Sequence, residues 1–174
     1  MGERKQKEKL KREFSAGGVV FKKKGNKTLW LVAQTASSRL FPETYWRLPK
    51  GWLDDKGNEP GPLASGEKKA TEEEIRRAAI KEVREEGGVE AKIVSKIGTV
   101  SYFYTWGGIR KLKFVTFFLM EWTNNLPEGF CWETSQTKWL PFEKAMQKLF
   151  SKSEKKVLEK AKIILEQGVQ SSLV

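Results

Sequence analysis

The pattern of hydrophobic and polar residues predicts a chain in which strands surround one central helix. Apolar and β-branched residues concentrate at 15–21 and 28–34, which is typical of buried strands. Two longer strands are expected at 93–106 and 109–122, because Gly107-Gly108 between them is a strong signal for a two-residue hairpin. Shorter extended segments are expected at 46–48 and 134–140.

Helix signals follow in three places. Thr71 with Glu74 three residues later is a capping-box pattern, and Gly87-Gly88 predicts where that helix ends. A short helix is expected at 141–149 and an amphipathic one at 153–167. The order of elements predicts a mixed α+β fold, in which a sheet carries one central helix and C-terminal helices.

The domain organisation is simple. Residues 1–13 alternate lysine and arginine with glutamate, so a basic N-terminal tail is expected there, followed by a single domain at 14–168. Within that domain, Asp, Gly, Pro, Lys and Ser dominate from 53 to 72, and Pro60 and Pro62 disfavour a helix. These residues therefore predict a loop within the domain.

Composition narrows the possible chemistry. The chain has 174 residues with no histidine and one cysteine, Cys131. These counts exclude histidine-based catalysis, zinc sites that use imidazole, and any intramolecular disulfide. Carboxylates, lysines, tyrosines and hard cations bound by oxygen remain.

Three glutamates of the central helix form the main candidate site. Glu82, Glu85 and Glu86 fall within roughly 100° of a helical wheel, on the stripe that also carries Ile75 and Ala78. Carboxylates so close repel one another unless a cation neutralises them, and oxygen ligands suit Mg²⁺ or Mn²⁺. The ordinary alternative for a helix of this composition is a solvated, charged face.

The surrounding residues favour the metal site. Glu73, seven intervening residues and then KEVREEGGV at 81–89 resemble the Nudix box, and WRLPKG at 46–51 is similar to the segment that precedes it, with Gly51 as the first glycine of the box. The resemblance implies the Nudix fold, an α/β/α sandwich with a mixed central sheet. It also implies a metal-dependent hydrolase that cleaves pyrophosphate bonds.

The resemblance also implies roles for individual residues. The expected metal ligands are the three glutamates and the backbone carbonyl of Gly51. Either Glu82 or a carboxylate from a distant loop is the expected general base, and Glu73 is expected to brace Lys81. Glu133 is a possible extra carboxylate near the metal, although a solvated loop glutamate is the alternative.

Two departures from the family pattern stand out. Lys81 replaces the arginine of the box, so a point charge takes the place of a group that can donate two parallel hydrogen bonds. In addition, 21 residues separate Gly51 from Glu73, where the family has five. This insert is expected to be a lid, a specificity loop or a neutral insertion.

The predicted hairpin supplies candidate substrate contacts. A two-residue turn places Tyr104 opposite Lys111 and Tyr102 opposite Lys113, with Trp106 on the same face. Aromatic rings and ammonium groups together suit a nucleotide, whereas an exposed strand face with solubilising lysines is the alternative. The stretch from Lys113 to Leu119 resembles diadenosine-polyphosphate and diphosphoinositol-type Nudix hydrolases.

Two cations of the lead-in segment, Arg47 and Lys50, are further candidates for phosphate contacts. The formal net charge of +11 favours polyanionic partners. Dinucleoside polyphosphates are therefore the first hypothesis for the substrate, RNA 5′ ends the second, and a non-catalytic nucleotide- or RNA-binding module the competing class.

Without an apolar stretch long enough for a membrane or an export signal, a cytoplasmic location is expected, and the oligomeric state stays open.

Overall fold

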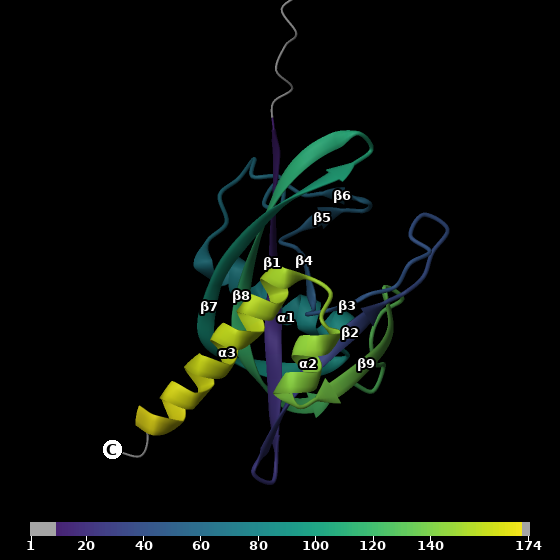
Figure 1. Ribbon diagram of the computed structural model, residues 1–174. Helices are drawn as coiled ribbons and strands as arrows, with labels where there is room; N and C mark the ends of the chain where they lie inside the picture. The colour runs from purple at the N-terminus through teal and green to yellow at the C-terminus, as the bar shows by residue number, and fades with distance from the viewer. Residues whose placement is uncertain (1–9, 172–174) are drawn as a thin grey trace, which may run out of the picture.

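A mixed sheet with helices on both faces forms the protein (Figure 1). We describe a computed structural model of residues 10–171, with side chains to residue 168. The sheet has seven strands, with β3, β2, β1, β8 and β7 in that order, while β4 pairs with β1 and β9 with β2. This arrangement confirms the predicted Nudix-type α+β architecture.

The strands are β1 (Lys11–Lys24), β2 (Lys27–Thr35), β3 (Trp46–Arg47), β4 (Lys50–Trp52), β5 (Asp55–Lys56), β6 (Glu59–Pro60), β7 (Val89–Trp106), β8 (Ile109–Asn125) and β9 (Thr134–Leu140). The helices are α1 (Glu72–Gly87), α2 (Phe142–Lys148) and α3 (Lys152–Ser171). None of these helices, within the described residues, is both long enough and apolar enough to cross a membrane.

The long hairpin of β7 and β8 has the predicted register. Trp106 pairs with Ile109, and the pairs Tyr104–Lys111 and Tyr102–Lys113 follow down the strands. Gly107 and Gly108 have φ of 56° and 77°, as a two-residue turn with left-handed central residues requires. The other long neighbour of β8 is β1, which runs parallel to it and makes the sheet mixed.

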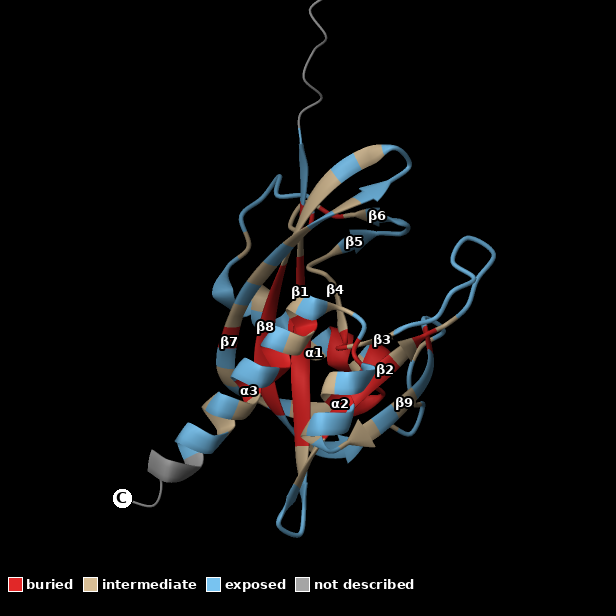
Figure 2. Cartoon of the chain, viewed as in Figure 1, coloured by how far each residue is buried: buried red, intermediate tan, exposed pale blue. Residues whose placement is uncertain are grey.

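Successive residues of the central strands divide the core into two layers. On β8, Phe118 packs with Val83 and Ala79 of α1, whereas Phe117 packs with Leu158 of α3 on the other face. This division follows from the alternation of side chains along a strand. The buried residues concentrate in the central strands and on the helix faces that cover them (Figure 2).

The start of β1 differs from the sequence-based expectation. Strand β1 begins at Lys11, so residues 11–13 belong to the sheet, where they pair with 111–113 of β8. The charges at 11–13 do not mark a solvated tail, because Glu13 is buried and accepts a hydrogen bond from Lys111 of β8. Residues 1–9 of the expected tail lie outside the described residues. The insert is mostly turns, with one short antiparallel pair, β5 and β6.

Candidate metal and phosphate site

Helix α1 presents two buried carboxylates at its C-terminal end. The capping box of Thr71 and Glu74 fixes the start of the helix, and Gly88 ends it with φ of 68°. Glu82 and Glu86, one turn apart, are buried. Glu85 is half-exposed, so it lies at the rim of the group and not within it.

Glu82 lies directly against Gly51 of β4. A Cβ atom at position 51 would be 2.3 Å from the Glu82 carboxyl carbon, so only glycine fits there. Among the described residues, the Glu82 carboxylate has neither a hydrogen bond nor an ion pair. Burial, followed by the charges of Glu86 and Glu85, raises its pKa to about 8.

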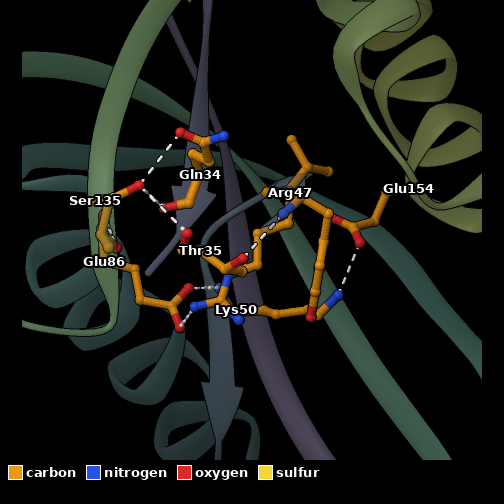
Figure 3. A network of polar contacts seen from close by, with 10 residues as sticks. Gln34, Thr35, Arg47, Lys50, Glu86, Ser135 and Glu154 are labelled. Atoms are coloured by element: carbon orange, nitrogen blue, oxygen red, sulfur yellow. Dashed lines mark hydrogen bonds and ion pairs between the residues drawn. The ribbon is translucent and has the colours of Figure 1, made fainter. Parts of the chain in front are cut away.

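Glu86 is held by two donors from the segment that precedes Gly51. Arg47 Nη2 lies 2.7 Å from Glu86 Oε1, and the Lys50 backbone N–H donates to Oε2 at 2.9 Å (Figure 3). Burial raises the pKa of Glu86 to about 7, although Arg47 and the Lys50 N–H oppose that shift. The Glu86 side chain is therefore oriented toward the Arg47–Gly51 segment.

This donor set fits a hard divalent cation. Two buried carboxylates with raised pKa values would be stabilised in their charged form by a cation, and oxygen ligands suit Mg²⁺ or Mn²⁺. As the side chains of the described residues lie, no three acidic, cysteine or histidine groups are gathered closely enough to hold a metal together. Arg47 pairs with Glu86 and Lys81 with Glu85, so two of the three predicted carboxylate ligands have cationic partners.

The expected pairing of Glu73 with Lys81 is wrong. Lys81 Nζ lies 3.7 Å from Glu85 Oε1 and 3.8 Å from Asp55 Oδ2 of the insert. The Glu73 carboxylate instead faces Arg77 at 3.8 Å in an exposed pair. Eight residues along a helix span about 12 Å, too far for a direct ion pair, so Glu85 and Asp55, and not Glu73, are the carboxylates that face Lys81.

Lys50 has a buried partner that the sequence-based interpretation did not include. Its Nζ lies 2.8 Å from Glu154 Oε2 of α3 (Figure 3). The other oxygen of Glu154 accepts a hydrogen bond of 2.5 Å from the Leu48 N–H. Glu154 precedes Val157 by three residues and Ala161 by seven, so it lies on the apolar stripe of its helix. A carboxylate on such a stripe is the signal that could have identified it.

A second buried carboxylate, Glu13, organises the outer part of the hairpin face. It accepts hydrogen bonds from Lys111 Nζ at 2.7 Å, from Trp52 Nε1 at 3.2 Å, and from the Tyr104 hydroxyl. Burial opposes ionisation, but these donors lower the pKa of Glu13. Two of the predicted substrate contacts, Tyr104 and Lys111, are thus already bound to a carboxylate of the protein.

Lys113 differs from the other cations of this face. Within the described residues, its ammonium group has no hydrogen bond or ion pair, and its nearest aromatic contact is the Tyr104 ring at 6.0 Å. Burial lowers its pKa to about 8, and the nearby charges of Lys50 and Arg47 act in the same direction. Although the charges of Glu13 and Glu86 act on it in the opposite direction, an ammonium group without a hydrogen bond or ion pair beside two other cations is a favourable position for an anionic ligand.

Two observations concern the edge of the site. Arg47 Nε is buried and has no hydrogen-bond partner in the described structure, so one donor beside Glu86 is unused. Glu133 is exposed, but its charge raises the pKa values of Glu82 and Glu86 and also that of Arg47, which places it near the cluster. Its role as an extra carboxylate stays a prediction.

The comparisons agree with this geometry. The sequence matches the NUDIX domain family over residues 11–161. A search of curated proteins found no match.

Solved structures show the same fold. An Ap4A hydrolase from C. elegans, in a binary complex, is 23% identical, covers 89% of this chain and 98% of its own, and has a TM-score of 0.58. A NUDIX hydrolase from Nitrosomonas europaea (17% identity, 86% and 88% coverage, TM-score 0.59) and the E. coli dihydroneopterin triphosphate pyrophosphohydrolase (19%, 87% and 95%, 0.55) are also similar. Since the family match spans most of the chain, the protein belongs to the NUDIX domain family, whose hydrolases act on pyrophosphate bonds.

Proposed function

We propose that the protein is a divalent-cation-dependent hydrolase that cleaves a pyrophosphate bond of a dinucleoside polyphosphate. The observation that carries this proposal is the buried, unpaired carboxylate of Glu82 against Gly51. A raised pKa of about 8 for this group is the state expected of a metal ligand in the absence of its metal.

The residues have distinct roles in this proposal. Glu82, Glu85 and Glu86, with the backbone carbonyl of Gly51, would hold Mg²⁺ or Mn²⁺. The bound cation would neutralise phosphate charge and lower the pKa of a water molecule. Either Glu82 or Glu133 would accept the proton of the attacking water.

Three cations would bind and orient the polyphosphate. Lys113 offers an ammonium group without a partner among the described residues, and Arg47 offers its unused buried Nε. Lys81 lies at the rim, between Glu85 and Asp55. Binding by several fixed cations compensates the charge of the substrate and holds the reacting phosphorus in place.

Aromatic residues support a nucleotide as the substrate. Tyr45 and Phe150 form a tilted pair with centroids 5.6 Å apart, both are exposed, and Tyr45 lies close enough to Arg47 to raise its pKa. Exposed rings beside a phosphate-binding residue suit a stacked base. An Ap4A hydrolase shares this fold, and the substrate in its name contains two nucleosides, as does the substrate proposed here.

RNA 5′ ends, a non-catalytic binding role and the expected cytoplasmic location remain predictions, and the oligomeric state stays open. The charge of +11 supports polyanionic substrates in general and does not favour RNA over a dinucleotide.

The experiment is a hydrolysis panel with Mg²⁺ and with Mn²⁺. It contains diadenosine tetraphosphate, ATP, ADP-ribose, a diphosphoinositol and triphosphorylated RNA, each tested with the parent protein and with Glu85→Gln. Glu85 is half-exposed, so its replacement leaves the core intact. Preferred turnover of diadenosine tetraphosphate, lost in the variant, is the expected result. Preferred turnover of RNA would make an RNA 5′ end, and not a dinucleoside polyphosphate, the substrate. Metal binding without any turnover would favour the binding-module alternative.

A further inference from the structure

A large cavity lies at the outer end of the hairpin, away from the glutamate cluster of α1. Its volume is about 1350 Å³, and its lining comes from the start of β1, the tip of the β7–β8 hairpin and the insert after β4, with Phe41 of the β2–β3 loop and Trp52 of β4. Figure 1 shows that the hairpin tip and the β5–β6 pair lie at the same end of the molecule. The insert contributes Asn58, Glu59, Pro60, Ser65 and Gly66.

Aromatic rings line one side of this cavity. Phe41 and Trp106 stack with centroids 5.0 Å apart and an angle of 23° between their planes. They remain 53% and 47% exposed, so ring surface is available to a ligand. Trp52 and Tyr104 extend the aromatic lining toward Glu13. Such a surface suits a flat, aromatic ligand.

Polar groups complete the lining. Lys11, Arg12 and Lys111 contribute positive charge, while Glu59 and Asn58 of the insert offer a carboxylate and an amide. A nucleobase presents both hydrogen-bond donors and acceptors at its edge, and the phosphate that follows its ribose is anionic. The cavity therefore matches the chemistry of a nucleoside with an attached phosphate.

Neighbouring residues connect the cavity with the candidate metal site. Trp52 lines the cavity, and Gly51 next to it lies against Glu82. On β8, Lys111 reaches the cavity and Lys113 lies near Arg47 and Glu86. Residues two apart on a strand share a face and are about 7 Å apart, a separation that a polyphosphate chain can span.

We propose that this cavity binds the distal nucleoside of the substrate, the base and ribose at the end of the polyphosphate away from the cleaved bond. This inference rests on the proposed function and deepens it. The insert then acts as a specificity element, because it supplies five of the residues that line the cavity. The volume exceeds the range of about 300–1000 Å³ common for ligand sites, so a nucleotide fits.

Substitution of Trp106 provides the test. Phe103 is the matched control, because it is similarly exposed at 53%, lies on the same strand, and is absent from the lining of the cavity. Trp106→Ala is expected to raise the KM for diadenosine tetraphosphate at least tenfold, with a much smaller effect on ATP, which lacks a second nucleoside. Phe103→Ala is expected to change neither value.

A binding measurement separates this inference from the proposed function. AMP is titrated against the parent protein and both variants without metal, with NMR as the readout. The inference predicts AMP binding that weakens at least tenfold in Trp106→Ala and not in Phe103→Ala. Trp106-dependent AMP binding without turnover of any compound would support the nucleoside site and refute the hydrolase. Turnover of diadenosine tetraphosphate that is indifferent to Trp106→Ala, with no AMP binding, would overturn the inference and leave the hydrolase standing.

Discussion

Lys50 and Glu154 form a buried ion pair, with Nζ and Oε2 2.8 Å apart, although 104 positions separate them in the chain. Glu154 also accepts a hydrogen bond from the Leu48 N–H. One carboxylate of α3 thus fastens the segment that leads into Gly51. The position of Gly51 against Glu82 therefore depends on the C-terminal helix as well as on β4.

Replacement of Glu154 by glutamine is expected to destabilise the protein. The amide keeps the shape of the side chain but leaves the buried Lys50 ammonium without a counter-charge, at a cost of about 3 kcal/mol in the free energy of unfolding. Urea denaturation measures this loss. The double variant Lys50→Met/Glu154→Gln is expected to recover most of it, since both charges are removed and the amide oxygen still accepts from the Leu48 N–H. Equal stability of parent and Glu154→Gln would contradict the role assigned to this pair.

A methyl group at position 51 is expected to displace the Glu82 carboxylate. The added Cβ would lie 2.3 Å from the carboxyl carbon, so Glu82 has to move. Because small misplacements at a reacting centre are costly, Gly51→Ala should lower kcat by about 100-fold. Mg²⁺ affinity, measured by calorimetry, should fall with it. A variant with parental metal affinity and turnover would show that Glu82 is not a ligand.

Glu82→Gln is expected to stabilise the metal-free protein at high pH. The pKa of Glu82 is about 8 in the folded protein and near 4.5 when unfolded, so between these values the folded state binds more protons. The free energy of unfolding therefore falls as the pH rises from about 4.5 to about 8. At pH 8.5 without metal, the neutral amide should be more stable than the parent by roughly 2 kcal/mol.

Two controls accompany that measurement. Glu86→Gln should have the opposite sign and destabilise the protein, since it leaves buried Arg47 without its partner. Added Mg²⁺ should raise the melting temperature of the parent at pH 8.5, because a ligand of the folded state stabilises it, and should not do so for Glu82→Gln. A parent protein whose stability does not decline toward pH 8 would refute the raised pKa.

Lys113 is expected to make substrate binding dependent on pH. Burial lowers the pKa of its ammonium to about 8, so the positive charge is lost as the pH rises through that value. The KM for the phosphorylated substrate should rise above pH 8. In Lys113→Arg the guanidinium stays charged, so this rise should disappear, whereas Lys113→Met should have a high KM throughout. KM values measured between pH 6.5 and 9.5 check this, and a flat parental profile would contradict it.

The lysine at position 81 is expected to limit activity. Its ammonium lies 3.7 Å from Glu85 and 3.8 Å from Asp55, contacts that are long for hydrogen bonds. A guanidinium can donate to both carboxylates at once and hold Glu85 in place. Lys81→Arg should therefore raise kcat severalfold and Lys81→Met should lower it, at unchanged melting temperature. A loss of activity in Lys81→Arg would show that the site is adapted to lysine.

Local sequence patterns were sufficient to predict the helices and strands and to place the glutamates of α1 together. The capping box placed the start of α1, the double glycine placed the hairpin turn, and the register of β7 and β8 followed from that turn. These features depend on residues close in the chain, where hydrogen-bonding geometry and side-chain periodicity leave few alternatives. Helix spacing likewise brought Glu82 and Glu86 to one buried face.

The partners of the charged groups could not be predicted in the same way. The sequence predicted Arg47 and Lys50 as phosphate contacts, but in the fold Arg47 pairs with Glu86 and Lys50 with Glu154. Asp55 and not Glu73 faces Lys81, because the insert returns beside α1.

The sequence by itself determined the family, the order of the elements and the carboxylates on the central helix, since each of these is encoded in short spacings. Only the tertiary structure decided which cations have a carboxylate partner. It also decided that Lys113 has no ion pair among the described residues and that the insert lines a cavity. The physical reason is that ion pairs and cavities form between segments far apart in the chain. Their partners are therefore set by the packing of the sheet, the helices and the insert, and not by local propensity.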